Sequence, residues 1–587
     1  MCGIIAGISN PIAPILLEGL KRVEYRGYDS VGIATVSDGK ILMKKDVGRI
    51  EALEAKYAVS TMPGSVGIAH TRWATHGGVT TANAHPHLSC DESIAVVHNG
   101  IIENYLELRS TLAKRGHVFR SETDTEVIAH LIEQASKRER DPLQATLKAL
   151  KRVKGQYAVV VMFAHHPDLL IGARNDAPLV VGLGKREFFL ASDVLAFISR
   201  TDRAVFLENM DVACISPRGL KVYNMQGKEV KRKVTQLAWE LADVSKQDFA
   251  HYTLKEIHEQ PETVQRAMLQ DPRKLEAFAS AIRNAGTVLL TASGSSFHAA
   301  LLLKGRLNRE AKVRCDAVLA GEFDHQAHFV DKDTVMIAFS QSGETADVLE
   351  AVKRGREAGA RILAVVNAVG STLARESDSV LLLNCGPEVG VAATKSFTAQ
   401  VMVGNMIADA VLGRRTVGDP KKLAGQVEET LESEATIKDV ALRFRDRPDF
   451  YFIARGPHYP VAQEGALKLK ELSYIHAEGI PASELKHGTL ALIEKGTPVV
   501  VIARSGDGFD AIISNATELK ARGAEIIGVS DVEHPVFSYR VPIPSCNESV
   551  SPVLEVIPLQ LLAYHMAVSR SNDPDYPRNL AKSVTVR

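Results

Sequence analysis

The most reactive side chain of this sequence stands at its second position. The chain begins MCGIIAGISN, so removal of Met1 would leave Cys2 with a thiol and a free α-amine on one residue. A thiol has an ordinary pKa of about 8.5 and an α-amine one of about 7.7–8.0, so the amine can accept the thiol proton directly or through a water. Cys2 is therefore a candidate nucleophile that carries its own base. A small apolar residue that merely begins a strand is the alternative.

Further segments hold the polar groups that such a nucleophile needs. HTRWATHG (70–77) and the pair Asn99–Gly100 end predicted strands, and SETDTE (121–126) precedes a predicted helix. Asn99 offers an amide N–H₂ and Gly100 an unobstructed backbone N–H, which are the donors that an oxyanion hole uses. Each segment also has a plainer interpretation. Asn99–Gly100 could be a turn, and Asp124 could stabilise the first turn of its helix.

Neither a metal site nor a cofactor is expected. His85 and His87 in NAHPH could suggest a metal, but no acids or cysteines cluster with them in the sequence. The six cysteines, at positions 2, 90, 214, 315, 385 and 546, form no CxxC pair, which argues against a zinc site and against a disulfide framework.

The composition indicates a cytoplasmic enzyme of several domains. A chain of 587 residues is too long for one core. Lys+Arg and Asp+Glu both number 70, so there is no basic field for nucleic acid. The longest apolar runs, such as PVVVIA (498–503), have the length of a strand and not of a bilayer span, and no secretory signal is visible. We expect no nucleic-acid partner and no membrane association.

The elements that position Cys2 and its neighbours are predicted to be of mixed type. Over the first 230 residues, strand-like runs such as SIAVVHNG and YAVVVMFA occur together with helical patterns at 14–23, 102–115 and 124–137. Because strands and helices do not alternate regularly, an α+β domain is predicted over residues 2–235. Residues 236–262 are polar and helical, include Pro261, and are predicted to be a linker.

The rest of the chain repeats one pattern of strand, Gly/Ser turn and helix, which predicts a parallel sheet. Three landmarks of the first copy recur in the second at offsets of 162, 163 and 164 residues. They are Gly294 and Gly456, Ser342–Gly343 and Ser505–Gly506, and Gly359 and Gly523. A tandem duplication of one α/β domain is therefore predicted, over residues 263–420 and 421–575.

Only the first copy carries hydroxyl-rich turns at two predicted strand ends, at residues 293–296 and 340–345. Hydroxyls, backbone N–H groups and a helix N-terminus favour a phosphate there. The second copy has ARSGDG with Asp507 and is less suited to an anion. The hydroxyls could instead only cap helices, but two such turns at the carboxyl ends of parallel strands favour a phosphorylated ligand.

Taken together, the N-terminal motifs resemble the class II glutamine amidotransferases, whose glutaminase domain is an N-terminal-nucleophile hydrolase with an αββα fold. The resemblance is carried by MCGI, EYRGYDS, HTRWATHG, NAHPH, HNGIIENY and SETDTE. It implies that Cys2 attacks the side-chain amide of glutamine with its α-amine as base. It also implies an oxyanion hole from Asn99 and Gly100, contacts of Arg72 and Asp124 with the glutamine carboxylate and amine, a site lined by Thr75 and His76, and a channel for ammonia gated by Trp73.

The tandem repeat resembles the SIS domain, an α/β parallel-sheet, flavodoxin-like fold that binds phosphorylated sugars. A class II glutaminase followed by two SIS domains resembles the glucosamine-6-phosphate synthase family over essentially the whole chain. The matching motifs are SQSGETAD (340–347), EVGVAATKSFT (388–398), EGALKLKELSYIHAEG (464–479), SELKHG (483–488) and RNLAKSVTV (578–586). The resemblance implies L-glutamine and fructose 6-phosphate as substrates, glucosamine 6-phosphate and L-glutamate as products, and a homodimer.

The same resemblance assigns the isomerase residues. Glu471 would move the proton between C1 and C2, and Lys468, three residues earlier on the same helix face, would help to protonate oxygens. His487 would assist ring opening from the neighbouring subunit, and Lys582, in a catalytic tail over residues 576–587, would form a Schiff base. The sugar phosphate would be held by Ser293, Gly294, Ser295, Ser296, Ser340, Gln341, Ser342 and Thr345, with Val391 and Ala392 beside the sugar.

Without the resemblance, Lys468 and Glu471 could be an ordinary exposed ion pair and Lys582 a solvated tail residue. Two departures concern the sugar: Ser293 stands where the family commonly has Cys, and Ala393 where many members have Ser. The glutaminase half also lacks a long regulatory insert, so inhibition by a nucleotide sugar is not expected.

Two other functions would each explain part of the sequence. An amidotransferase with a phosphoribosyl diphosphate acceptor would need one phosphoribosyltransferase domain and not a tandem repeat. A non-catalytic sugar-phosphate sensor would not need Cys2, Asn99–Gly100 or Lys582.

Overall fold

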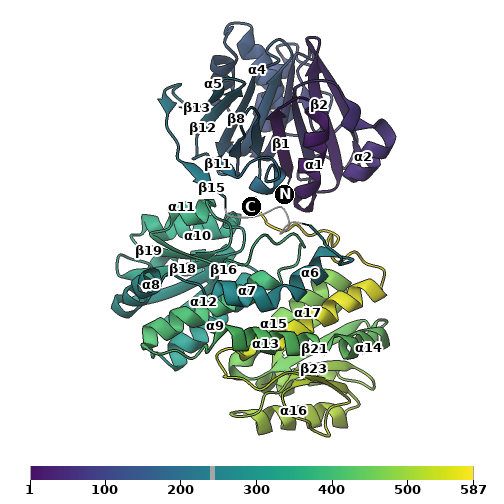
Figure 1. Cartoon of the computed structure of the whole chain (residues 1–587), viewed down its shortest axis with the longest axis vertical. Helices are drawn as coiled ribbons and strands as arrows, with labels where there is room; N and C mark the ends of the chain where they lie inside the picture. The colour runs from purple at the N-terminus through teal and green to yellow at the C-terminus, as the bar shows by residue number, and fades with distance from the viewer. Residues whose placement is uncertain (1, 238–244, 586–587) are drawn as a thin grey trace. The chain divides into compact units, whose positions relative to one another are not determined.

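The computed structural model describes residues 2–237 and 245–585. The chain divides into two compact units (Figure 1). The first consists of Met1–Val244 together with Ala581–Arg587, and the second of Ser245–Leu580.

The first unit is built on two antiparallel sheets. Its strands are β1 (Gly3–Ile8), β2 (Ser30–Ser37), β3 (Lys40–Val47), β4 (Val66–Arg72), β5 (His87–Leu88), β6 (Ile94–Ile102), β7 (Gly155–Phe163), β8 (Leu170–Asn175), β9 (Val180–Leu183), β10 (Phe188–Ala191), β11 (Arg203–Phe206), β12 (Asp211–Ser216), β13 (Gly219–Asn224), β14 (Glu229–Val230) and β15 (Val234–Gln236). In the described part of the unit the sheet orders are β15-β11-β9-β10-β1-β4-β2-β3 and β14-β13-β12-β8-β7-β6-β5. Its helices are α1 (Ala13–Arg22), α2 (Ile50–Tyr57), α3 (Tyr105–Ala113), α4 (Glu126–Ser136) and α5 (Pro142–Leu150).

Alternation along the strands explains the layers. Successive side chains of a strand point to opposite faces of its sheet. On β6, Val97 lies in the core between the two sheets with Ile4 and Ile68 of the other sheet. Its neighbour Val96 lies in a separate core with Ile132 of α4. Helices α3, α4 and α5 thus cover one sheet, and α1 packs on β1 and β4 of the other. The prediction of an α+β, αββα domain is confirmed.

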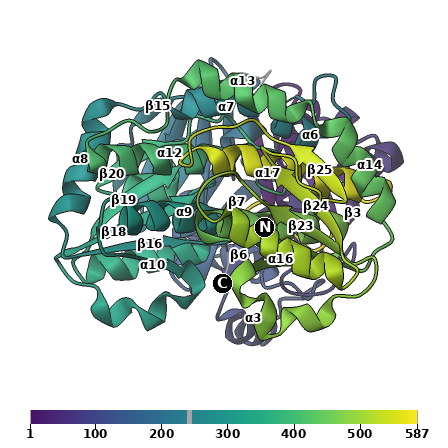
Figure 2. The same ribbon diagram turned by 90° about the horizontal axis from the view of Figure 1, so that it is seen from below.

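The second unit contains two parallel sheets of identical topology. The strands of the first are β16 (Thr287–Ala292), β17 (Cys315–Leu319), β18 (Thr334–Ser340), β19 (Arg361–Val366) and β20 (Ser379–Leu382), and those of the second are β21 (Asp449–Ala454), β22 (His476–Pro481), β23 (Pro498–Ile502), β24 (Glu525–Ser530) and β25 (Tyr539–Pro542). Within the described residues the orders are β17-β16-β18-β19-β20 and β22-β21-β23-β24-β25. Each sheet therefore has the strand order 2-1-3-4-5, which is that of flavodoxin-like folds. The predicted tandem duplication is confirmed, and Figure 2 shows the two sheets in separate lobes.

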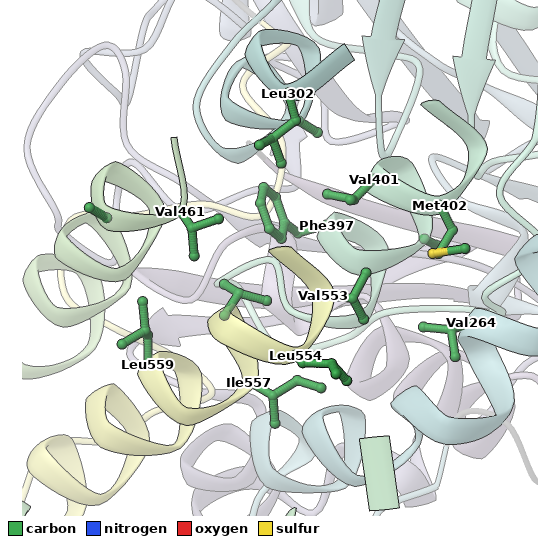
Figure 3. Close-up of a cluster of buried hydrophobic side chains, with 14 of the residues drawn as sticks. Val264, Leu302, Phe397, Val401, Met402, Val461, Val553, Leu554, Ile557 and Leu559 are labelled. Carbon is green, nitrogen blue, oxygen red and sulfur yellow. The ribbon is translucent and has the colours of Figure 1, made fainter. Parts of the chain in front are cut away.

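Helices of both repeats share one core (Figure 3). The helices are α6 (Tyr252–His258), α7 (Gln260–Ala267), α8 (Pro272–Asn284), α9 (Ser295–Arg309), α10 (Ala346–Glu357), α11 (Thr372–Glu376), α12 (Lys395–Leu412), α13 (Pro420–Leu431), α14 (Glu434–Phe444), α15 (Tyr459–Ser473), α16 (Phe509–Ala521) and α17 (Ser551–Ser569). Phe397 and Val401 of α12 and Leu302 of α9 belong to the first repeat. They lie in the same buried cluster as Val461 of α15 and Val553 of α17 from the second. This common core fixes α9 against α15.

In the described part of the chain, α17 is long and apolar enough to cross a membrane by length and composition. In this structure 89% of its most apolar 18-residue stretch is buried, as in the core helix of a folded domain. The sequence analysis did not find this segment, because Pro558, Gln560 and His565 interrupt its apolar residues.

The residues predicted as a linker are partly structured. Helix α6 and the start of α7 fall in this segment and belong to the second unit, where Ile257 and Gln260 are fully buried. Residues 238–244 of the predicted linker lie outside the described residues. The predicted catalytic tail is divided, since residues from Ala581 onward belong to the first unit.

Candidate active sites

The structure brings Cys2, Trp73 and Asn99 together. Cys2 leads into β1, whose neighbour β4 delivers Trp73 one residue after its end. The backbone N–H of Trp73 donates to Cys2 Sγ at 3.2 Å, and Asn99 Nδ2 donates to the Cys2 carbonyl at 2.8 Å. Burial raises the pKa of the Cys2 thiol, although the Trp73 N–H and the Arg72 charge oppose this. A thiol that stays protonated at neutral pH needs a base before it can attack.

Asn99 is oriented by a buried histidine that the sequence analysis did not single out. His70 Nε2 lies 3.1 Å from both Asn99 Oδ1 and the carbonyl of His98. Since both oxygens accept, this ring nitrogen carries the proton. Burial lowers the pKa of His70 to about 3, so the ring is neutral. The bond fixes the amide oxygen of Asn99 toward His70 and its N–H₂ toward Cys2. His70 was visible as the first residue of HTRWATHG, but its role depends on contacts across two strands.

Gly100 is fixed by the close approach of two strands. Its φ is +129°, and a Cβ at this position would stand 2.0 Å from the carbonyl oxygen of Gln156 on β7. A side chain is therefore excluded at Gly100, and its predicted role in the oxyanion hole stays a prediction.

The loop after β4 is organised by Arg72. This side chain is buried, and its guanidinium donates to the carbonyls of His76, Gly77 and Gly78 at 2.5, 3.1 and 3.1 Å. Thr75 is exposed, with its hydroxyl 3.5 Å from Nδ1 of the half-buried His76. Because Arg72 uses its donors on this loop, its predicted contact with the glutamine carboxylate stays a prediction.

Asp124 is also buried, and one of its oxygens accepts the backbone N–H of Ile102 at 2.8 Å. This bond ties the segment before α4 to the end of β6. Asp124 thus lies beside the strand that carries Asn99 and Gly100.

In the second unit the structure joins the two repeats through Lys468. Its ammonium donates to Glu471 at 2.5 Å and to Ser295 of the first repeat at 3.0 Å, and it forms an ion pair with Glu464 at 3.4 Å. Burial alone would lower the pKa of Lys468, but the carboxylates of Glu471 and Glu464 outweigh it and raise the pKa to about 12. Lys468 is therefore a buried cation, and the alternative of an exposed ion pair is wrong.

Glu464 and His298 were missed by the sequence analysis. Glu464 is fully buried, and its carboxylate accepts from His298 Nδ1 at 2.7 Å. Burial by itself raises the pKa of Glu464. The charge of Lys468 and the hydrogen bond from His298 lower this pKa by more than burial raises it, so the net shift is downward. The i, i+4 spacing of Glu464 and Lys468 was a usable signal, whereas His298 comes from α9 of the other repeat. His298 and Gly294 also line a cavity of about 270 Å³ with Gln463, Ala466, Leu467, Lys470 and Glu478.

The two hydroxyl-rich turns lie side by side. Strands β16 and β18 pair in parallel, so residues 293–296 and 340–345 follow neighbouring strand ends. The Ser340 hydroxyl accepts the N–H of Gly343 at 2.9 Å, and the Ser342 hydroxyl that of Glu344 at 3.2 Å. Gly294 and Gly343 have φ of +55° and +65° and make the sharp turns.

The five other members of the phosphate set are also placed. Ser296 accepts from Gln400 Nε2 at 2.8 Å, Ser340 and Thr345 have their hydroxyls 3.5 Å apart, and Gln341 and Ser293 are half-buried. Ser295 both begins α9 and contacts Lys468, which connects these turns to the isomerase residues.

The remaining predicted residues stand in three other segments of the chain. Val391 and Ala392 are buried in the loop before α12, where the Val391 N–H donates to the carbonyl of Asp575 at 3.3 Å. His487 is exposed at the end of the 3₁₀ helix η8 (Ala482–His487). Lys582 lies in the tail segment assigned to the first unit. The roles of these four residues stay predictions.

Comparison with known proteins follows this division of the chain. A glutamine amidotransferase domain model matches residues 70–199, and a SIS domain model matches residues 281–410 and 443–570. Proteins named glutamine–fructose-6-phosphate aminotransferase (isomerizing) from Thermococcus kodakarensis and Pseudomonas putida are 45% and 43% identical to this chain, and each alignment covers 100% of both chains.

The chain belongs to the glutamine–fructose-6-phosphate aminotransferase (isomerizing) family. A solved structure agrees with this membership. The C-terminal domain of glucosamine-fructose-6-phosphate aminotransferase from Francisella tularensis matches with a TM-score of 0.53 and 33% identity, and it covers 57% of this chain and 100% of its own. Membership of the aminotransferase family confirms the resemblance from which the site residues were assigned.

Proposed function

We propose that this protein converts L-glutamine and fructose 6-phosphate into L-glutamate and glucosamine 6-phosphate. Hydrolysis of the glutamine amide in the first unit releases ammonia and glutamate. In the second unit the ammonia replaces the C2 oxygen of the sugar, which leaves as water, and a proton moves from C1 to C2. Full-length relatives with this name at 45% and 43% identity support the reaction.

The isomerase assignment rests on the contacts of Lys468, which join the two repeats. Its ammonium touches Ser295, at the predicted phosphate turn, and Glu471, the predicted base. A sugar phosphate bound at the turn that contains Ser295 would therefore lie close to the Lys468 ammonium, which in turn contacts the Glu471 carboxylate. In this proposal Glu471 abstracts the C1 proton, and Lys468 stabilises negative charge on the sugar oxygens.

A difference between the repeats supports phosphate binding in the first only. Asn367 follows β19, and its backbone N–H donates to the carbonyl of Gln341 in the turn. The equivalent residue of the second repeat, 164 positions later, is Asp531, which accepts from the N–H and hydroxyl of Ser505 at 2.8 and 2.5 Å. A carboxylate there repels an anion and occupies the hydroxyl that would bind it.

In the glutaminase half, the proposal assigns Cys2 as nucleophile, Asn99 and Gly100 as oxyanion donors, and Arg72 and Asp124 as glutamine ligands. The bond between Asn99 and the Cys2 carbonyl supports this, because it holds an amide N–H₂ beside the nucleophile. The proposal also keeps Trp73, whose N–H touches the thiol, as the gate for ammonia.

The proposal further includes a cytoplasmic homodimer. All six cysteines lie within the described residues and are free thiols, as in a reducing compartment. His487 is exposed and is proposed to act in the site of the second subunit, and Lys582 is proposed to bind the open sugar as a Schiff base.

The isomerase assignment is tested by product analysis in D₂O. With wild-type protein, glutamine and fructose 6-phosphate, we expect glucosamine 6-phosphate in which part of the C2 hydrogen is deuterium. Glu471→Gln should abolish the amino sugar, whereas the control Glu432→Gln, an exposed acid directly after α13, should not change it. Normal product formation by Glu471→Gln would refute the assignment of the base.

The shared site is tested by mixing two inactive variants. His487→Ala and Glu471→Ala chains, unfolded and refolded together, would form mixed dimers with one intact site. About a quarter of the wild-type activity is then expected, because half of the dimers are mixed and half of their sites are intact. Absence of recovery would contradict a site shared between subunits.

A further inference from the structure

Four potential metal ligands converge in the first unit, apart from the residues assigned to glutamine hydrolysis. Cys90 lies in the turn between β5 and β6, His117 follows α3, and His130 and Glu133 lie one turn apart on α4. One ligand atom from each, namely Sγ, two imidazole nitrogens and a carboxylate oxygen, lies within 4.8 Å of all the others. Both histidines are buried.

The distances between these atoms resemble the edges of a tetrahedral zinc site. Zn–S bonds of about 2.3 Å and Zn–N bonds of about 2.05 Å at tetrahedral angles put sulfur and nitrogen about 3.6 Å apart. Cys90 Sγ lies 3.7 Å from His117 Nδ1 and 3.6 Å from His130 Nδ1. The same bonds put nitrogen and oxygen about 3.3 Å apart. Glu133 Oε2 lies 3.3 Å from His130 Nδ1 and 2.8 Å from His117 Nδ1.

The other ring nitrogen of each histidine is directed at an oxygen. His117 Nε2 lies 3.1 Å from Gln134 Oε1, and His130 Nε2 lies 3.5 Å from a carboxylate oxygen of Glu126. If each Nε2 donates its proton to these acceptors, both Nδ1 atoms turn lone pairs toward the thiol and the Glu133 carboxylate. Metal-bound histidines are commonly held in this way by a second set of acceptors.

The Cys90 sulfur and the Glu133 carboxylate are also held by hydrogen bonds from backbone N–H groups. The backbone N–H of Val118 donates to Cys90 Sγ at 3.3 Å, and that of Cys90 donates to Glu133 Oε2 at 3.3 Å. Cys90, His117 and Glu133 are thus each held by a further hydrogen bond, and His130 faces the Glu126 carboxylate at 3.5 Å. Four ligand atoms gathered and held in this way are suited to a cation between them.

We propose that Cys90, His117, His130 and Glu133 bind a zinc ion. On binding, the Cys90 thiol loses its proton to solvent and the thiolate forms the Zn–S bond, while Nδ1 of each histidine and Oε2 of Glu133 complete a tetrahedral set. Of the four distances given above, only that between Glu133 Oε2 and His117 Nδ1 departs from the tetrahedral spacing, by about 0.5 Å. Four protein ligands leave no position for a substrate, so the ion is structural.

The ion would clip three segments of the chain together next to the predicted glutamine site. Asp124 stands two residues before α4, which carries His130 and Glu133, and the loop from His117 leads directly into it. Loss of the ion is therefore expected to loosen the Asp124 segment and to raise the KM for glutamine more than it lowers kcat.

This proposal departs from the expectation that the chain holds no metal. The ligands are 27, 13 and 3 residues apart, so they do not form a CxxC motif that the sequence analysis could recognise. Cys90 and His117 become neighbours only in the folded domain. The His130–x–x–Glu133 spacing on one helix face was the local signal that was available.

The test is metal analysis of the full-length protein, purified without an affinity metal and dialysed against metal-free buffer. We expect about one zinc per chain by mass spectrometry. Cys90→Ser should lose it. The matched controls Cys214→Ser, a half-buried thiol of the same unit, and Cys2→Ser should keep it. Zinc content near zero in wild-type protein expressed with added zinc, or unchanged zinc in Cys90→Ser, would overturn the proposal.

A spectroscopic measurement on wild-type protein does not depend on how the variants fold. Metal-free protein titrated with Co²⁺ should show the intense visible bands of tetrahedral cobalt and a thiolate-to-cobalt charge-transfer band, with an end point of about one ion per chain. Zinc should displace the cobalt and raise Tm relative to the metal-free protein. Absence of both the bands and the Tm shift would mean that the four side chains form only a hydrogen-bonded cluster.

Discussion

Replacing Lys468 by methionine removes the cation that neutralises two carboxylates. Glu464 is fully buried and Glu471 largely so, and both pair with the Lys468 ammonium. Removing one partner of a buried ion pair costs about 3–5 kcal/mol, because the other charge is left uncompensated. His298 still contacts Glu464 at 2.7 Å, so we expect a value near the lower limit. For a unit of the size of residues 245–580, this range corresponds to a fall in Tm of about 4–7 °C.

The charge argument predicts a specific rescue. Adding Glu464→Gln to Lys468→Met removes the fully buried one of the two carboxylates that are left uncompensated, so the double variant should regain most of the lost Tm. It should nevertheless form no glucosamine 6-phosphate, because the proposed cation of the sugar site is still missing. The loss of stability and the loss of activity are thereby separated.

The assay is differential scanning calorimetry of the full-length variants, with amino-sugar formation measured on the same samples at a temperature where all are folded. A Tm of Lys468→Met equal to that of wild type would refute the electrostatic reasoning. Recovery of activity in the double variant would show that Lys468 acts only in folding.

Three further outcomes are expected. Asn367→Asp should raise the KM for fructose 6-phosphate at least about 10-fold, because it adds a negative charge at the residue whose backbone N–H donates to Gln341 of the phosphate turn. The reverse change at the equivalent position, Asp531→Asn, should leave the KM unchanged; equal KM values for both would contradict phosphate binding in the first repeat. Asn99→Ala should lower kcat for glutamine hydrolysis by about 10²–10³, checked by glutamate release, and a loss under about 10-fold would argue against an oxyanion donor. Hydrogen bonds from two imidazoles at 2.8 and 2.9 Å lower the pKa of Glu434 to about 2, so the stability that it contributes is present above its ordinary pKa of 4.5 and is lost as pH falls toward 2. Between these pH values wild type should lose about 1–2 kcal/mol more stability than Glu434→Gln in urea unfolding, and parallel losses would contradict the linkage.

Much of this architecture was predictable because it depends on local patterns. The strand–turn–helix series and its near-constant offset gave the duplication, and β19 and β24 indeed begin 164 residues apart at Arg361 and Glu525. Helices α1 and α4 lie within two residues of their predicted bounds. Such patterns can be read from the sequence because buried apolar residues recur with the period of the helix or strand that contains them.

Other features were not predictable, because they depend on contacts between distant segments. His298 and Glu464 meet only when the two repeats share their core. His70 orients Asn99 across two sheets, which no spacing in HTRWATHG reveals. Helix α6 looked like a linker because its sequence is polar, yet Glu256 is buried there and accepts the N–H groups of Val389 and Gly390.

The central claim is that glutamine hydrolysis and amino-sugar formation are coupled on one chain. The most direct measurement supplies glutamine labelled with ¹⁵N in its amide together with fructose 6-phosphate, and quantifies glutamate and labelled glucosamine 6-phosphate in the same sample. The account predicts equal yields of both products, and neither product with Cys2→Ala. Glutamate without labelled amino sugar would contradict the proposed acceptor, and amino sugar formed by Cys2→Ala from glutamine would contradict the proposed nucleophile.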